Sequence, residues 1–131
     1  MGTKDSADYD GNPRRRLGLA GEAAAEARLR RDGLEIVARG FRARCGEIDL
    51  IARDGRVVVF VEVKTRTGNA FGSPAEAVTA LKRRRIARAA SVFLARSDWS
   101  DRPCRFDVVE VVPVGAGWRV THIPDAWRTG D

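Results

Sequence analysis

The sequence predicts an α/β fold with the element order α-β-β-β-α-β-β, in which a mixed β-sheet is flanked by helices. Three observations predict it. An alanine-rich stretch near the N-terminus and a longer stretch with an apolar stripe have the patterns of helices. Runs rich in valine and isoleucine alternate as strands do. Glycine-containing turns, of which Asp54-Gly55 is the strongest, separate neighbouring runs.

The first half of the chain follows this order closely. Leu17 to Arg31 favours a helix, which Asp32-Gly33 ends because glycine is the usual residue after a helix C-terminus. Leu34 to Arg42 is strand-like. Glu47 to Arg53 and Arg56 to Arg66 are predicted to form a hairpin around Asp54-Gly55.

The second half repeats helix and strands. Ser73-Pro74-Ala75-Glu76 is typical of a helix start, with a serine cap and a proline at the first position, and this helix should run to about Arg96. Arg105 to Val114 and Trp118 to Ile123 are predicted strands, and Pro124 to Trp127 closes the domain. We expect residues 1–13 to be a disordered polar tail and residues 14–131 to be one domain.

The amino-acid composition indicates which class of protein to expect. Of 131 residues, 44% are hydrophobic and 32% charged, which is typical of a soluble globular protein, and no apolar run reaches the roughly 18 residues of a membrane span. The N-terminus lacks the apolar core of a secretory signal, so we expect a cytoplasmic protein with no membrane partner. The net charge of +6 suggests a polyanionic partner, nucleic acid before membrane surface.

The cysteines and the histidine do not suggest a zinc site. Cys45 and Cys104 are far apart in sequence, and His122 is the only histidine, so too few ligands are present. We expect two free thiols and a structural His122.

The predicted hairpin has one unusual face. On its second strand Val57, Val59, Val61 and Val63 share one face, while the other carries Val58, Phe60, Glu62, Lys64 and Arg66. On its first strand Ile48, Leu50 and Ala52 take one face, and Glu47, Asp49 and Ile51 the other. The pattern indicates a sheet covered on both sides that opens into a polar cleft at one end.

The turn sets an approximate register for the acidic residues. With Asp54 and Gly55 as loop residues, Arg53 faces Arg56, and Asp49 becomes a diagonal neighbour of Glu62, about 7–8 Å away. Two carboxylates at that spacing could converge on a hard cation such as Mg²⁺ or Mn²⁺. The alternative is a solvated face on which Glu62 and Lys64 form cross-strand ion pairs.

Asp49, twelve intervening residues and then Glu62-Val63-Lys64 match the D…(D/E)xK signature of the PD-(D/E)xK nuclease superfamily. A longer pattern resembles the YraN family of endonuclease-like proteins over about residues 14–127. The matching segments are Gly18-Leu19-Ala20-Gly21-Glu22, GEIDLI at 46–51, VFVEVKTR at 59–66, FG at 71–72 and RFDVV at 105–109. The resemblance implies a restriction-endonuclease-like, nuclease-like domain, similar to archaeal Holliday junction resolvases. The chain departs from the family pattern at Arg28, Gly40 and Arg83.

The resemblance also implies roles for individual residues. Asp49 and Glu62 would hold Mg²⁺ (or Mn²⁺), with the Val63 carbonyl as a further ligand, and Lys64 would orient the attacking hydroxide or pair with the phosphate. The family pattern adds Glu22 from the first helix. Spacing alone does not distinguish Glu22 from Glu26, which can instead pair with Arg30.

Further residues are candidates for binding and support. The nucleic-acid-binding candidates are Arg14, Arg66, Lys82, Arg83 and Arg85. A solvated basic surface is the alternative for Arg14 and for the helix residues 82–85. The candidates for supporting the site are Glu47, Arg105 and Asp107, although Arg105 and Asp107 could simply pair with their neighbours.

The resemblance implies a metal-dependent endonuclease that hydrolyses phosphodiester bonds in DNA, with branched or structured DNA among its substrates. A homodimer would suit a symmetric junction. Two alternatives stay open: a non-catalytic nucleic-acid-binding or adaptor protein that retains the nuclease fold, and a structural partner of a larger complex.

Overall fold

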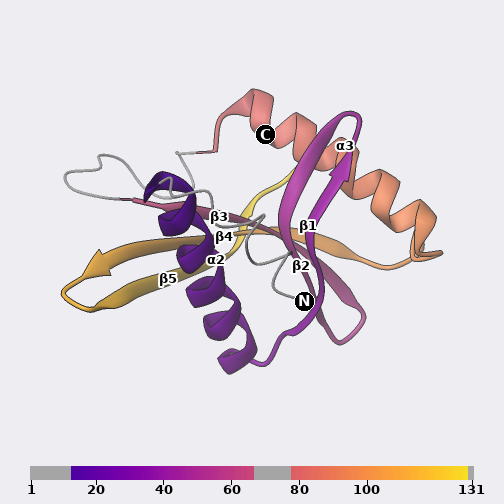
Figure 1. Cartoon of the computed structure of the whole chain (residues 1–131). Coiled ribbons are helices and arrows are strands. Elements are labelled where there is room, and N and C mark those ends of the chain that lie inside the picture. Colours follow the sequence, from indigo (N-terminus) through magenta and orange to yellow (C-terminus); the bar gives the residue numbers. More distant parts are fainter. Residues whose placement is uncertain (1–12, 67–77, 130–131) are drawn as a thin grey trace, which may run out of the picture.

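The computed structural model describes residues 13–66 and 78–129 (Figure 1). Their elements follow the predicted order α-β-β-β-α-β-β, which confirms the fold class. They are α2 (Pro13–Arg31), β1 (Glu35–Ala43), β2 (Gly46–Asp54), β3 (Val57–Thr65), α3 (Ala80–Arg96), β4 (Cys104–Val114) and β5 (Gly117–Trp127).

The strands form one mixed sheet in the order β1-β2-β3-β4-β5. Neighbouring strands are antiparallel except β3 and β4, which are parallel because the chain crosses over through α3 between them. Helix α2 packs on one face and α3 on the other, and the β1–β2 hairpin curls toward α3 (Figure 1). The central strands are therefore covered on both sides, as their apolar composition requires.

Two apolar clusters hold the layers together. On the α3 side, the ring of Phe106 stacks on Trp127 with centroids 4.1 Å apart, and Phe93 meets Phe60 edge to face. On the α2 side, Leu29 packs with valines of β3 and β4. The predicted division of β3 into two faces is correct, because Val58 and Phe60 belong to the first cluster and Val59 and Val61 to the second.

The predicted alternation of β2 is wrong at one residue. Ile48 packs with Ile51 on the α3 side, whereas Leu50 and Ala52 pack on the α2 side. The strict period of two is lost because β2 leaves β3 between Ile48 and Leu50, where the ladder ends at the pair Leu50 and Val61.

The predicted register of the β2–β3 hairpin is also wrong. Asp54 pairs with Val57, so the loop residues are Gly55 and Arg56, not Asp54 and Gly55. Gly55 has φ +60° at the first loop position, where a tight hairpin needs a backbone that glycine adopts without strain. Continuing this register past the last ladder pair brings Asp49 opposite Glu62 instead of diagonal to it.

The limits of three elements differ from the prediction by more than one residue. Helix α2 begins at Pro13, before the expected Leu17, and β5 extends through Pro124 to Trp127. As an edge strand, β5 tolerates the missing proline N–H. The expected unbroken helix from Ser73 is wrong, because Thr79 is extended and caps α3 by accepting from the Lys82 N–H; Ser73-Pro74 itself lies outside the described residues.

Candidate active site

The site begins where β2 separates from β3. The Asp49 carboxylate accepts a hydrogen bond from the Val63 backbone N–H at 2.8 Å. The side chain thus satisfies a donor on β3 that a strand carbonyl would otherwise satisfy. Asp49 is held against the segment that carries Glu62 and Lys64.

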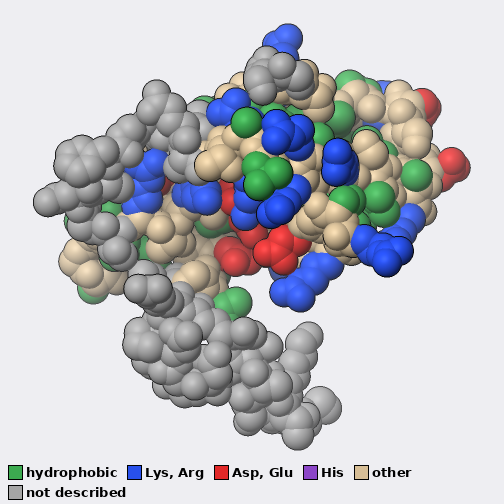
Figure 2. Space-filling view, turned by 90° about the horizontal axis from the view of Figure 1, so that it is seen from above, with side chains coloured by type: hydrophobic (Ala, Val, Ile, Leu, Met, Phe, Trp, Pro, Cys, Tyr) green, Lys and Arg blue, Asp and Glu red, His purple; other side chains and the backbone are tan. Residues whose placement is uncertain are grey.

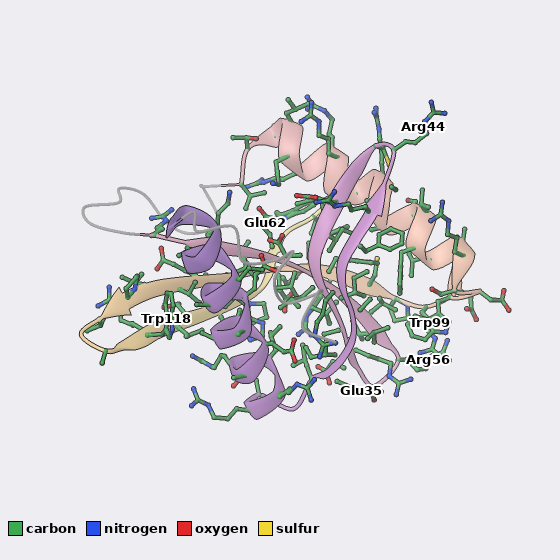
Figure 3. All side chains as sticks on the ribbon, viewed as in Figure 1. Glu35, Arg44, Arg56, Glu62, Trp99 and Trp118 are labelled. Carbon is green, nitrogen blue, oxygen red and sulfur yellow. The ribbon has the colours of Figure 1, made fainter. Side chains whose placement is uncertain are left out.

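Glu62 lies between two lysines from different elements. Its Oε2 is 3.5 Å from the Lys64 Nζ on the same strand and 3.4 Å from the Lys82 Nζ on α3. The side chain is only 5% exposed, so its charge needs such partners. Figure 3 shows Glu62 in the space flanked by α2, α3 and the β1–β2 hairpin.

The acids at this site act on one another. Burial, followed by the nearby charge of Glu62, raises the pKa of Asp49 to about 7, while the hydrogen bond from Val63 opposes the rise. A proton shared between the carboxyl groups of Glu62 and Asp49 also favours the raised pKa of Asp49. Burial, then the charges of Glu47 and Glu62, raise the pKa of Glu22. The structure therefore brings Glu22, Asp49 and Glu62 near one another.

Close packing of α2 positions Glu22. A Cβ on Gly21 would lie 2.9 Å from the Val111 Cγ2 and would also collide with the Thr65 side chain. The absence of a side chain lets the helix rest directly on the ends of β3 and β4. Glu26 faces elsewhere, with its carboxylate 2.6 Å from Arg39 and 2.9 Å from Arg30. The structure thus separates two acids that spacing alone did not.

The three supporting candidates lie in two separate places. Glu47 is exposed and 3.3 Å from Arg42, and its charge reaches Glu22. Asp107 is fully buried and pairs with Arg105 at 3.0 Å, not with the site's acids. It also contacts His122 at 2.7 Å and accepts from the Asp125 N–H. This second polar network joins β4 to β5.

The nucleic-acid-binding candidates are dispersed. Lys82 lies at the site, and Arg85 is exposed on the same helix. Arg83 turns the other way, donating to the Val78 carbonyl at 3.0 Å beside Trp127. Arg66 is 12% exposed and pairs with Glu110 at 3.1 Å. Arg14 is in the first turn of α2, and its side chain is not among those that the structure describes.

The sequence analysis did not select Arg42, at the end of β1, or Arg44, in the turn between β1 and β2. They lie beside Lys82 and Arg85 in the structure. The sequence feature that could have identified them is a pair of arginines shortly before the GEIDLI segment. Figure 2 shows Lys and Arg side chains gathered around a small acidic patch on this side of the molecule.

The side chains at this site provide only some of the ligands that a hard cation needs. Asp49 and Glu62 offer adjacent carboxylate oxygens, the ligand type that Mg²⁺ and Mn²⁺ prefer. Among the described residues, no three Asp, Glu, His or Cys side chains are arranged to surround an ion. Both lysines contact the Glu62 carboxylate in its present position. Two neighbouring carboxyl groups are therefore in place, and within the described part of the chain no third such ligand completes the set.

Comparison with known proteins identifies the family. The profile of the uncharacterised protein family UPF0102 matches residues 21–111. This chain belongs to the UPF0102 family. The match includes Glu22, Asp49, Glu62 and Lys64 and confirms the predicted YraN-like membership.

Relatives match the UPF0102 chain over most of their length. A UPF0102 protein of Symbiobacterium thermophilum is 62% identical over 99 residues, 76% of this chain and 84% of the relative. One of Geotalea daltonii is 48% identical over 88% of this chain and 92% of the relative. One of Geotalea uraniireducens is 44% identical over 98% of both chains. No helix in the described part of the chain is long and apolar enough to cross a membrane.

Proposed function

We propose that this UPF0102 protein is a metal-dependent endonuclease that hydrolyses phosphodiester bonds in DNA, with branched or structured DNA among its substrates. One observation carries the proposal. Asp49 and Glu62 place two interacting carboxyl groups at the point where β2 and β3 separate, with the Lys64 ammonium 3.5 Å from Glu62. Adjacent acids and a lysine at a strand opening suit cation binding next to a phosphate.

Two of the residues present carry the oxygen ligands that Mg²⁺ or Mn²⁺ prefers. Asp49 and Glu62 would hold the ion, with the Val63 carbonyl and Glu22 as further candidates. When bound, the ion supplies charge neutralisation at the phosphate and lowers the pKa of water. Burial and then repulsion among the acids raise the pKa values of Asp49 and Glu22, and the positive charge of the ion would offset the repulsion.

The chain's own residues account for the other requirements of hydrolysis. Lys64 and Lys82 offer ammonium groups on two sides of Glu62, where a phosphate oxygen could accept from either of them. Glu22 has a pKa above its ordinary value and could accept a proton from water. The Val63–Asp49 hydrogen bond keeps the Asp49 carboxylate from rotating freely.

A second function is favoured by one observation. The two lysines already compensate the charge of Glu62 without any metal. A protein that only binds nucleic acid, or serves as an adaptor, could be stable with this arrangement. Metal-dependent cleavage distinguishes the two functions.

The test is cleavage of labelled duplex, flap, single-stranded and four-way-junction DNA with Mg²⁺ or Mn²⁺. Wild type is compared with Glu62→Gln, and Glu26→Gln is the control because Glu26 is an acid outside the site. We expect metal-dependent cutting that Glu62→Gln removes and Glu26→Gln keeps. Absence of cutting by wild type on every substrate would instead support the binding function. Gel filtration with a junction bound would show whether a homodimer forms.

A further inference from the structure

A basic hollow lies beside the candidate active site. It has a volume of about 480 Å³ and opens between the β1–β2 turn and α3. The charged residues that line it are Arg42, Arg44 and Glu47 from the hairpin and Lys82 and Arg85 from the helix. Figure 3 shows Arg44 at the tip of the hairpin, next to α3. Lys82 belongs to both the hollow and the site, so the two are continuous.

Close backbone contact builds the walls of the hollow. A Cβ on Gly46 would lie only 2.9 Å from the Arg85 carbonyl oxygen, so the absence of a side chain allows the hairpin to touch α3. This contact sets the spacing between Arg44, two residues before Gly46, and Arg85 on the facing helix. Two arginines from elements distant in sequence are thereby held on opposite sides of one hollow.

The charge of the hollow is incompletely balanced. Arg42 is 3.3 Å from Glu47, and Lys82 is 3.4 Å from Glu62. Within residues 13–66 and 78–129, neither Arg44 nor Arg85 has an ion pair, although both are exposed. Two uncompensated guanidinium groups facing one hollow favour an anion with several acceptor oxygens, such as a phosphate.

We propose that this hollow binds a backbone phosphate of the DNA, next to the phosphate that lies at Glu62. Arg44 and Arg85 are the binding residues. The proposal rests on the proposed DNA-binding function and extends it to a named subsite. An internal phosphodiester fits better than a chain end, because the arginines are exposed and a strand can pass across the opening. Such a contact reads no base, so it supports sequence-independent binding.

The experiment measures DNA affinity in a Glu62→Gln background, without metal, across a series of salt concentrations. The probes are a labelled duplex with 5′-hydroxyl ends, the same duplex with 5′-phosphate ends, and a closed circle without ends. The test variant is Arg44→Ala/Arg85→Ala. The matched control is Arg119→Ala, which removes an exposed arginine from β5 at the opposite edge of the sheet.

We expect the double variant to bind all three probes about tenfold more weakly at low salt, and the slope of log affinity against log salt to fall by about two. Arg119→Ala should leave the slope unchanged. Arg44→Lys/Arg85→Lys should restore most of it, because the charges return. Circular dichroism of each variant verifies folding.

Two results would overturn the proposal. An unchanged slope in the double variant would show that the hollow holds no phosphate. A loss restricted to 5′-phosphate ends would assign the hollow to a terminal monoester. Because binding is measured without cleavage, either result is separate from the failure of wild type to cut DNA.

Discussion

The Asp49 carboxylate accepts from the Val63 N–H at 2.8 Å, at the place where the β2–β3 ladder has already ended. A side chain therefore continues the connection between two strands whose backbones have separated. This one hydrogen bond keeps the strands joined at the base of the opening. It also presents the second oxygen of Asp49 to the space shared with Glu62 and Glu22.

Asp49→Asn should stabilise the metal-free protein at pH 8. The folded-state pKa of Asp49, about 7, lies above its ordinary value of 3.8, so the protonated form is favoured by folding. Protonated Asp49 contributes its full stabilisation below about pH 3.8, and this contribution is lost as pH rises through about 7. Asparagine stays neutral and can still accept from Val63. We expect a gain of about 1–3 kcal/mol in the free energy of unfolding at pH 8.

Thermal and urea unfolding in EDTA at pH 6 and pH 8 would measure this effect. Asp98→Asn is the control, because Asp98 is exposed and its positive φ tolerates asparagine. The gain should be smaller at pH 6. A less stable Asp49→Asn protein at pH 8 would contradict the expected repulsion among the acids.

Lys82→Met should strengthen the binding of a divalent ion. Lys82 and a metal ion would compete for the same Glu62 carboxylate, and removal of the ammonium leaves that oxygen available. We expect Mg²⁺ or Mn²⁺ to raise the melting temperature of the variant at lower concentration than that of wild type. The ion should have little effect on Glu62→Gln.

The control for this comparison is Arg88→Met, on an exposed position of the same helix that does not contact Glu62. The rate of DNA cleavage by Lys82→Met should fall, because Lys82 is lost as a phosphate partner. If Lys82→Met required more metal than wild type, the ammonium and the ion would not share a site.

Gly21→Ala should destabilise the protein, whereas Gly18→Ala should not. A methyl group at position 21 would meet Val111 and Thr65, and the overpacking costs about 1–3 kcal/mol. At position 18 the added carbon meets nothing within 4 Å, so the helical preference of alanine gives a gain of about 0.5–1 kcal/mol. Urea unfolding of the pair measures the difference. Equal stability of the two variants would show that α2 does not rest on β3 and β4 as described.

His122 should stabilise the fold in a pH-dependent way. The hydrogen bond that His122 donates to Asp107 raises the pKa of His122 despite the opposing effect of burial, and Asp32 adds to the rise. The contribution of the charged ring is full below about pH 6.5 and is lost as pH rises through the raised folded-state value. We expect His122→Gln to remove about 1–3 kcal/mol at pH 6 and less at pH 9.

This comparison is made in the Asp49→Asn background, because Asp49 also loses stabilisation as pH rises. Urea unfolding at both pH values gives the two differences. A His122→Gln effect that does not vary with pH would mean that the ring is neutral against Asp107.

The sequence by itself determined the order of helices and strands and the kinds of side chain at the site. Alternating valines, the alanine-rich helix and the Asp49…Glu62-Val63-Lys64 spacing are local patterns, and local backbone preferences produce them. The sequence could also place the hairpin turn near Gly55. It could not set the register, because the choice of loop residues depends on which position takes the positive φ.

Only the tertiary structure decided which side chains meet. The register of β2 against β3 brings Asp49 opposite Glu62, and the packing of Gly21 on the sheet selects Glu22 over Glu26. The crossover through α3 brings Lys82 to Glu62 and Arg85 to the β1–β2 turn. These contacts join residues far apart in the chain, so their distances follow from how helices and strands pack together and not from any local pattern.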